Sequence, residues 1–301
     1  MTLTRRRFIA VSAVVAALPA AARAGTVQLV RTGQALGASA SIRLDHPRAA
    51  AIAARVQAEI ERLDAVFSLY RPDSALVRLN RDGGLEAPPF ELLDCLATAG
   101  AVHGASGGTF DPTVQPLWTL WAEAVTAGRE PAPADIAAVP RGWEGVALDA
   151  GRITLAPGMA LTLNGVAQGY VADRVAALLA EEGLTGIFID TGEMRALGGA
   201  PAGGGWPVAL ESGPRITLAD RALATSAPLG TTFDQTGRLG HILDPRSGGP
   251  VPARWRSVSI SAGSAALADA LSTAACALRD RAGIDAMLAR FPGTRLEALA
   301  A

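Results

Sequence analysis

The sequence predicts an α+β fold in which a mainly antiparallel sheet packs against helices. Two observations carry this prediction. Apolar residues recur at helical spacing in several separate segments, and short strand-like segments are grouped between those helices. Gly- and Pro-containing turns of hairpin length separate the strands. Strands and helices grouped in this way are typical of α+β domains. No linker or internal repeat divides the sequence, so residues 25–301 are expected to form one domain.

The first half is predicted to begin with two strands and to continue with helices. Residues 27–44 alternate apolar and polar side chains around a Gly-rich turn. Residues 48–67 carry an apolar stripe at helical spacing, formed by Ile52, Val56, Ile60, Leu63 and Phe67. The further expected elements are helices over 90–103 and 112–127, a loop opening at Pro131, and a hairpin over 146–155 that turns at Ala150 and Gly151.

The second half is predicted to hold a long helix, a group of strands and two final helices. Residues 168–182 have an amphipathic pattern that ends at Gly183. A strand is expected to lead into this helix, and four or five short strands are expected between 186 and 262. The last helices are expected over 264–278 and 281–290.

The first 24 residues have the pattern of a twin-arginine signal peptide. Arginines 5–7 precede an apolar core over 11–18, which is too short to span a bilayer. Ala22, Arg23 and Ala24 form a cleavage signal of the A-x-A type, so the mature chain would begin at Gly25. A signal of this kind predicts export of the folded protein to the periplasm.

Composition narrows the function classes. The formal net charge is −1, which does not favour nucleic-acid binding. The two cysteines, Cys95 and Cys276, lie in apolar segments that read as helices. An oxidising compartment would permit a disulfide between them, but two buried thiols are the favoured interpretation.

Asp269 and Thr273 stand four residues apart in a segment made otherwise mostly of alanine and leucine. On a helix these two side chains lie on one face, one turn apart. A carboxylate and a hydroxyl in that arrangement suit a hard cation such as Mg²⁺, which prefers oxygen ligands. The alternative is a first helical turn in which the aspartate caps backbone N–H groups.

Two glycine-containing segments could approach a ligand closely. Residues 107–114 join two glycines to Thr109, Phe110 and Asp111, and Asp111 could either contact a ligand or cap the following helix. Residues 162–170 lead into the helix predicted over 168–182 and could offer backbone N–H groups to a phosphate. The alternative for this second segment is an ordinary tight turn.

Three further positions have both a functional and a structural interpretation. His241 begins an apolar segment beside an Asp-Pro turn, where an imidazole could accept a proton from a hydroxyl or be merely structural. Tyr70 follows the first helix and could stack on a ring ligand or close the core. The hydroxyls of residues 225 and 226 could belong to a site or to a solvated turn.

Taken together, these segments resemble the ApbE family of FAD:protein FMN transferases. The resemblance covers about residues 33–290 and depends on six motifs that occur in the family's order. The motifs are SLYRPDSALVRLN at 68–80, GGTFDPTVQPLW at 107–118, LNGVAQGYVADRV at 163–175, DTGEMRALG at 190–198, ALATSAP with GHILDPRSGGP across 222–250, and ADALSTA at 268–274.

The resemblance implies an ApbE-like, T-fold-related architecture and a reaction. Such enzymes bind FAD with Mg²⁺ on its diphosphate and transfer the FMN half to a Thr or Ser hydroxyl of another protein, releasing AMP. By resemblance Asp269 and Thr273 are metal ligands, helped by Ser272 and the carbonyl of Gly165, and His241 takes the proton of the acceptor hydroxyl. The positions that correspond to FAD contacts are Leu36, Tyr70, Thr109, Phe110, Asp111, Thr162, Gln168 and Leu243. Asp269→Ala should abolish turnover while the protein still folds, because a metal ligand on a helix surface contributes little to core packing.

The sequence departs from the family's pattern at three places. Thr162 stands where the family often has Asp, Gln168 where it has Lys, and Thr191-Gly192-Glu193 replaces a Gly-Gly-Asp pattern. With the export signal, these features resemble the NosX-type members, which are linked to nitrous oxide reductase maturation through flavinylation of a membrane-bound flavoprotein. Two alternatives remain open: an FAD pyrophosphatase giving FMN and AMP, and a non-catalytic flavin-binding assembly protein.

Overall fold

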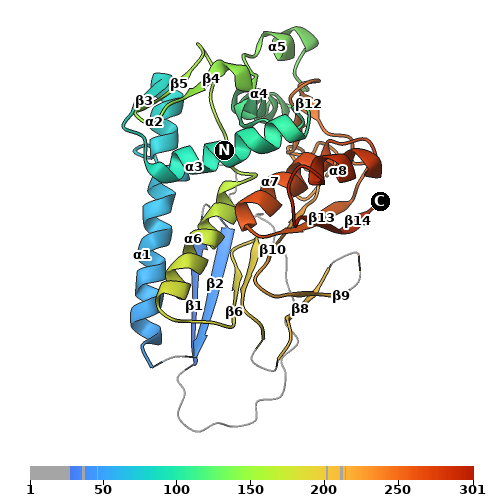
Figure 1. The fold of residues 1–301 in the computed structure, drawn as a ribbon. Helices are drawn as coiled ribbons and strands as arrows, with labels where there is room; N and C mark the ends of the chain where they lie inside the picture. The colour runs from blue at the N-terminus through green and yellow to red at the C-terminus, as the bar shows by residue number, and fades with distance from the viewer. Residues whose placement is uncertain (1–27, 36–37, 46, 201–202, 211–212, 214) are drawn as a thin grey trace.

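A seven-stranded antiparallel sheet runs through the molecule (Figure 1). The computed structural model describes residues 28–301 apart from 36–37, 46, 201–202, 211–212 and 214. Every neighbouring pair of strands in this sheet is antiparallel. In order across the sheet the strands are β1 (Gln28–Ala35), β2 (Ala38–Asp45), β6 (Ile187–Asp190), β7 (Met194–Leu197), β10 (Ala222–Ser226), β13 (Ser257–Ala262) and β14 (Arg295–Ala300).

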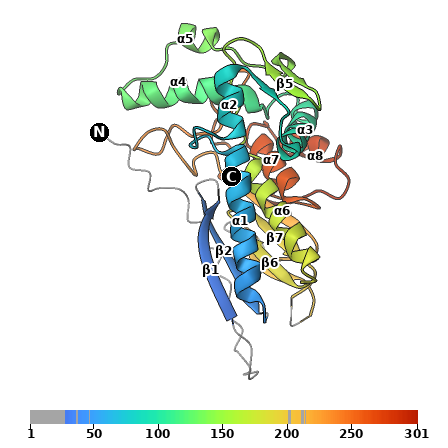
Figure 2. The ribbon, with the colours of Figure 1, turned by 90° about the vertical axis from the view of Figure 1, so that its left-hand side faces the viewer.

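Three helices cover one face of this sheet, namely α1 (Ala49–Phe67), α6 (Ala167–Glu181) and α7 (Ala265–Cys276) (Figures 1 and 2). The apolar stripe predicted for the first helix is buried throughout its length. α7 contacts β10, β13, α6 and α3 (Phe90–Ala105), so it is surrounded by other elements. The main hydrophobic core therefore lies between the sheet and these helices.

A hairpin of β8 (Trp206–Ala209) and β9 (Arg215–Leu218) packs near the opposite face of the sheet. Met194 and Leu223 form a second apolar cluster with Val208 of this hairpin. Successive side chains of a strand point to opposite faces, and Arg195, next to Met194, reaches Asp173 of α6 at 3.3 Å. β7 and β10 are thus covered on both sides.

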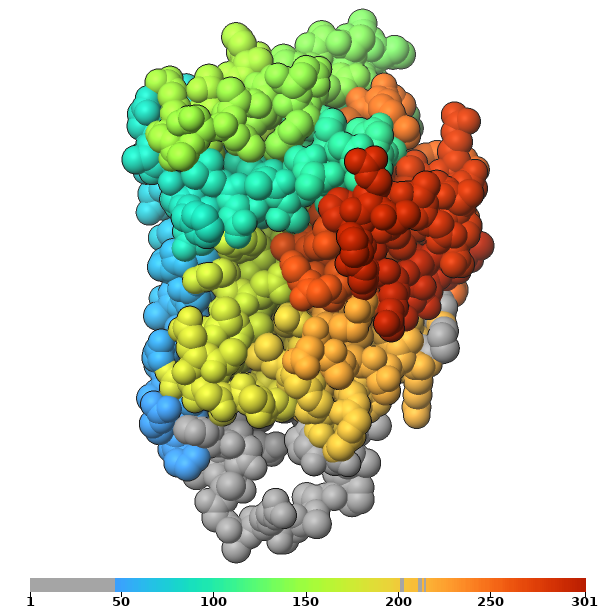
Figure 3. Space-filling model, in the orientation of Figure 1, coloured from blue at the N-terminus to red at the C-terminus, as the bar shows by residue number. Residues whose placement is uncertain are grey.

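Residues 75–155 form a layer across the end of the sheet, in which α3 lies next to α6 and α7 (Figure 3). It includes a three-stranded sheet in the order β3-β5-β4, and α8 follows α7 before β14. The remaining elements are α2 (Ala75–Asp82), β3 (Gly84–Glu86), η1 (Pro112–Val114), α4 (Gln115–Thr126), α5 (Pro133–Ala138), η2 (Trp143–Gly145), β4 (Val146–Leu148), β5 (Arg152–Leu155), β11 (Leu243–Asp244), β12 (Gly249–Pro250) and α8 (Arg281–Leu288).

The predicted α+β class and the predicted helices are confirmed, and four details are wrong. Between 186 and 262 the described chain forms eight strands rather than four or five, because several span only two to four residues. The short loop at Pro131 is present, but it is followed by an unpredicted helix, α5, whose Pro133 suits a first helical turn. Residues 156–166, which lead into α6, form no strand. An unpredicted helix, α2, begins at Ser74, whose hydroxyl accepts from Val77 N at 3.1 Å.

Both cysteines are buried free thiols, which confirms the favoured interpretation. Among the described residues, none of the helices combines the length and apolar character needed to span a membrane. The predicted signal segment, residues 1–24, and the predicted ligand contact Leu36 lie outside the described residues.

Candidate active site

The first turn of α7 is anchored to α6 by Asp173. Its carboxylate accepts hydrogen bonds from Ala265 N at 2.9 Å, Ala266 N at 3.0 Å and Ser264 Oγ at 2.8 Å. These backbone groups are the unpaired donors of a helix start, where a negative charge is favoured. Burial raises the pKa of Asp173, and these bonds oppose that rise. The two helices are therefore held together where the predicted cation site begins.

Gly169 allows α6 and α7 to approach closely. A Cβ atom at this position would lie 2.2 Å from the carbonyl oxygen of Ala265. Only glycine leaves the room for this contact. The N–H of Gly169 is 3.4 Å from Oδ2 of Asp269, so that carboxylate faces the first turn of α6. The carboxylate thus lies at the junction of the two helices.

Asp269 is buried, with 3% of its surface exposed. The expectation that it lies on a helix surface is therefore wrong, because α7 is packed on several sides. Burial raises the pKa of Asp269 to about 7, and the Gly169 N–H opposes the rise. A carboxylate in this environment gains from a cation that compensates its charge.

Three hydroxyls lie beside Asp269. Ser226 Oγ, at the end of β10, is 2.7 Å from Ser272 Oγ and 3.2 Å from Thr273 Oγ1. Ser272 Oγ also donates to the carbonyl of Asp269 at 3.0 Å. The possibility of a solvated turn at Ser226 is therefore wrong. The structure thus brings Asp269, Ser272 and Thr273 together with Ser226, for which the sequence left open whether it belongs to a site.

Gly165 lies against the same cluster. A Cβ atom at Gly165 would be 3.1 Å from Thr273 Oγ1 and 3.2 Å from Cε2 of Phe110. The backbone at Gly165 can therefore approach the hydroxyl of Thr273. This contact joins the turn before α6 to α7, as a cation bound by both segments would require.

Glu193 is a site residue to which the sequence patterns assign no role. It lies in the turn between β6 and β7, is 8% exposed, and its buried Oε2 has no hydrogen-bond partner. Burial raises the pKa of Glu193 well above its ordinary value, and the negative charges of Asp269 and Asp190 add to the rise. Only the acidic residue in the motif at 190–198 hinted at this position.

These residues fit a hard divalent cation. Two buried carboxylates and several hydroxyls gather where Gly165 approaches α7. No group of three or more His, Cys, Asp or Glu residues suited to a metal occurs in the part of the chain that the structure describes. The donors at this site are oxygen atoms of several kinds, which suits Mg²⁺ better than Zn²⁺.

The segment of Thr109, Phe110 and Asp111 lies between α3 and α7. Thr109 Oγ1 donates to the carbonyl of Ala274 at 3.4 Å, and Phe110 is buried in the core. Asp111 Oδ1 accepts from Thr113 N at 2.9 Å, so Asp111 caps the following turn, which was one of its two possible roles. A contact of these residues with FAD stays a prediction.

The two unusual positions, Thr162 and Gln168, flank the Gly165 turn. Thr162 N donates to the carbonyl of Pro112 at 2.8 Å, which joins this turn to the segment at 109–112. Gln168 is the second residue of α6 and precedes Gly169. Both are partly buried. They therefore lie next to the cation site, where a changed charge would act on a bound ligand.

His241 is held in a defined orientation. Its Nδ1 is 2.9 Å from the carbonyl oxygen of Thr231. A carbonyl only accepts, so Nδ1 carries the proton and Nε2 keeps a lone pair. Burial lowers the pKa of His241, with partial opposition from this hydrogen bond. The imidazole therefore favours its neutral form more than an exposed histidine does, and its Nε2 is able to accept a proton.

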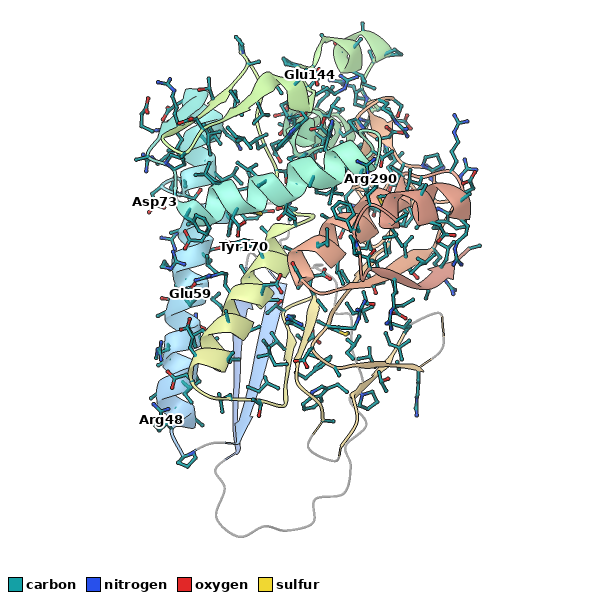
Figure 4. All side chains as sticks on the ribbon, viewed as in Figure 1. Arg48, Glu59, Asp73, Glu144, Tyr170 and Arg290 are labelled. Atoms are coloured by element: carbon teal, nitrogen blue, oxygen red, sulfur yellow. The ribbon has the colours of Figure 1, made fainter. Side chains whose placement is uncertain are left out.

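Two other residues predicted to contact FAD differ in solvent exposure: one is exposed and the other is buried. The Tyr70 residue is 60% exposed, so it does not close the core and can offer its ring to a ligand. Leu243 is buried with Leu117 and Trp121 in a third apolar cluster. The second tyrosine, Tyr170, points from α6 toward α3, where its hydroxyl is 3.1 Å from Asp94 Oδ2 (Figure 4).

Comparison with known proteins assigns the chain to a family of transferases. The model of the ApbE family matches residues 36–297, and the chain therefore belongs to the ApbE family. An FAD:protein FMN transferase of Vibrio cholerae is 28% identical over 279 residues, covering 85% of this chain and 83% of that protein. The protein of the same name from Chlamydia trachomatis is 30% identical over 236 residues, covering 73% and 75%.

Solved structures agree with this assignment. The apo form of the Pseudomonas stutzeri flavinyl transferase ApbE has a TM-score of 0.76 and 28% identity, covering 87% of this chain and 88% of that one. The ApbE protein of Thermotoga maritima has a TM-score of 0.79 and 28% identity, covering 91% and 96%. The predicted family, the fold class and the expectation of an enzyme are thereby confirmed.

Proposed function

We propose that this protein transfers the FMN moiety of FAD to a Thr or Ser hydroxyl of another protein and releases AMP, in a reaction that needs Mg²⁺. The observation that carries the proposal is the cluster of Asp269, Thr273 and Gly165 at the junction of α6 and α7. The names of the family relatives, FAD:protein FMN transferase, support the same reaction.

Each group in the site has a defined task in this reaction. Asp269, Thr273 and the Gly165 carbonyl, with Ser272, would hold Mg²⁺, which neutralises the diphosphate when bound. His241 Nε2 accepts the proton of the acceptor hydroxyl. The hydroxyl oxygen then attacks the phosphorus of the FMN half, the bond from that phosphorus to the bridging oxygen breaks, and AMP leaves. Residues 109–111 and 162–168 would position the FAD.

The cellular setting is also part of the proposal. The arginine-rich signal over residues 1–24 supports export by the twin-arginine pathway and a periplasmic location. A periplasmic flavin transferase would act on the exposed part of a membrane-bound redox protein, in keeping with the NosX-type resemblance. Replacing Arg5 and Arg6 by lysine should leave the unprocessed protein in the cytoplasm.

The reaction is tested by incubating the mature protein, residues 25–301, with FAD and Mg²⁺, with and without a flavin-acceptor fragment that carries its Thr motif. AMP together with an FMN-sized mass gain on the fragment supports the transferase. AMP formed equally without the fragment indicates FAD hydrolysis. Bound FAD without AMP indicates a flavin-binding assembly protein, and it would make Thr162 and Gln168 the first positions to revert.

His241→Ala should slow transfer by about 10²–10⁴-fold, the usual contribution of a general base. FAD affinity should change little, because the proposed role concerns the acceptor proton. Single-turnover transfer and equilibrium FAD binding measure the two effects separately, and added imidazole should restore part of the rate. Weaker FAD binding with an unchanged transfer rate would contradict the base role.

The pH dependence of transfer follows from the lowered pKa of His241. A base works only when deprotonated, and its folded pKa lies below the ordinary value of about 6.5. The midpoint of the acid limb should therefore lie below about pH 6.5, and the rate should be level from about pH 7.5 upward. In a pH series of single-turnover rates, an acid limb centred above pH 7 would be inconsistent with this assignment.

A further inference from the structure

The carboxylate of Glu193 is fixed at the end of the sheet that meets α7. Thr191 donates from N at 3.1 Å and from Oγ1 at 3.3 Å to the carbonyl of Glu193, which fixes the turn. Met194, the next residue, pairs with Leu223 of β10. β10 then continues to Ser226, whose hydroxyl contacts Thr273. The turn therefore lies beside the hydroxyl cluster of the proposed cation site.

One oxygen of this carboxylate is buried without a partner. Its Oε2 is inaccessible to solvent and has no hydrogen-bond partner. The charges that act on it most strongly belong to Asp269 and Asp190, and both are negative. A buried carboxylate is costly unless it is paired, hydrogen-bonded or bound to a metal ion. A divalent cation between Glu193 and Asp269 would give Glu193 Oε2 a partner and would compensate the charge of both carboxylates.

We propose that Glu193 is a further ligand of the divalent cation held by Asp269 and Thr273, reached by its free Oε2 directly or through one water. This rests on the proposed function for the existence of the cation. It adds a second negative charge to the protein's own donors. Two carboxylates match the charge of the ion, so the protein binds the ion before FAD arrives.

The test measures Mn²⁺ binding to the mature protein without FAD, from the electron paramagnetic resonance signal of the free ion. Mn²⁺ is a suitable probe because it takes the same oxygen ligands as Mg²⁺. Glu193→Gln should raise the Kd by about 10–100-fold. Glu193→Asp, which keeps the charge, should bind more tightly than Glu193→Gln.

Asp190→Asn is the matched control. Asp190 lies at the start of the same turn, but its Oδ1 accepts from Gly192 N at 3.1 Å and its side chain is only partly buried. This variant should bind Mn²⁺ nearly as the wild type does. Thermal melting in EDTA should show that Glu193→Gln is at least as stable as the wild type, because the amide keeps the shape and removes a buried charge.

The outcomes separate this inference from the proposed function. If Glu193→Gln binds Mn²⁺ like the wild type, or the wild type takes up none without FAD, Glu193 is not a ligand of this kind. If, in that case, the wild type still transfers FMN to an acceptor protein, the proposed transferase function holds and only the role of Glu193 as a ligand is wrong. If Mn²⁺ binding depends on Glu193 but FAD yields no AMP, the cation site stands and the transferase fails.

Discussion

Asp269→Asn is expected to abolish AMP release from FAD. Its carboxylate is the charged ligand from α7 in the proposed site, and the amide keeps its size but loses its negative charge. A bound divalent ion contributes several kcal/mol to stabilising the charge of a phosphoryl-transfer transition state. A loss of about 4 kcal/mol corresponds to roughly a 10³-fold slower reaction. AMP formation in saturating Mg²⁺ measures the effect.

The same variant should stay folded. The substitution removes a negative charge that raises the pKa of the buried Glu193, so melting in EDTA should occur at or above the wild-type temperature. Asp285→Asn, on an exposed face of α8 where Asp285 pairs with Arg281, is the control and should leave AMP release unchanged. Full activity of Asp269→Asn at saturating Mg²⁺ would exclude Asp269 as a metal ligand.

The parts of the site that could be predicted from sequence are local. The spacing of Asp269 and Thr273 depends only on helical periodicity, and α7 formed where the pattern placed it. The burial of Asp269 could not be predicted in the same way. It depends on α3, α6 and two strands that reach α7 from distant parts of the chain. A short Ala-rich helix has the same sequence pattern whether it is exposed at the surface or buried inside the protein.

Ser226, whose role the sequence left open, and Glu193, to which it gave none, became part of the site through strand register. Ser226 and Glu193 are about 45 and 75 residues away from Thr273 and Asp269 in sequence, and only the pairing of β7 with β10 brings them to the same edge. A similar limit applies to His241. Its position was predicted, but the tautomer depends on the carbonyl of Thr231. Chemical roles that depend on such long-range contacts can be assigned only from the folded structure.

Gly169→Ala is expected to have the largest effect on stability. The added methyl would lie 2.2 Å from the carbonyl oxygen, 2.4 Å from the carbonyl carbon of Ala265 and 2.6 Å from the nitrogen of Ala266. These are all backbone atoms, so no side-chain rotation relieves the overlap. α6 and α7 must separate, which weakens the bonds of Asp173 to the first turn of α7.

Overpacking together with weakened buried hydrogen bonds should lower the free energy of unfolding by about 2–4 kcal/mol. For a chain of this size that loss corresponds to a melting temperature lower by roughly 5–12 °C, measurable by calorimetry. Gly104→Ala is the matched control, because no atom lies within 4 Å of its added Cβ in α3. Alanine should stabilise that helix by up to about 1 kcal/mol.

The two glycine variants should therefore shift the melting temperature in opposite directions. The shift at Gly169 should also carry a functional change, since its N–H faces Asp269 across the helix junction. Separation of α6 from α7 moves Gly165 away from Thr273, so Mn²⁺ should bind more weakly even at temperatures where the variant is folded. If Gly169→Ala has the melting temperature and the Mn²⁺ affinity of the wild type, the two helices must leave room for a methyl group at this position. That result would contradict the 2.2 Å separation between the added Cβ and the carbonyl oxygen of Ala265.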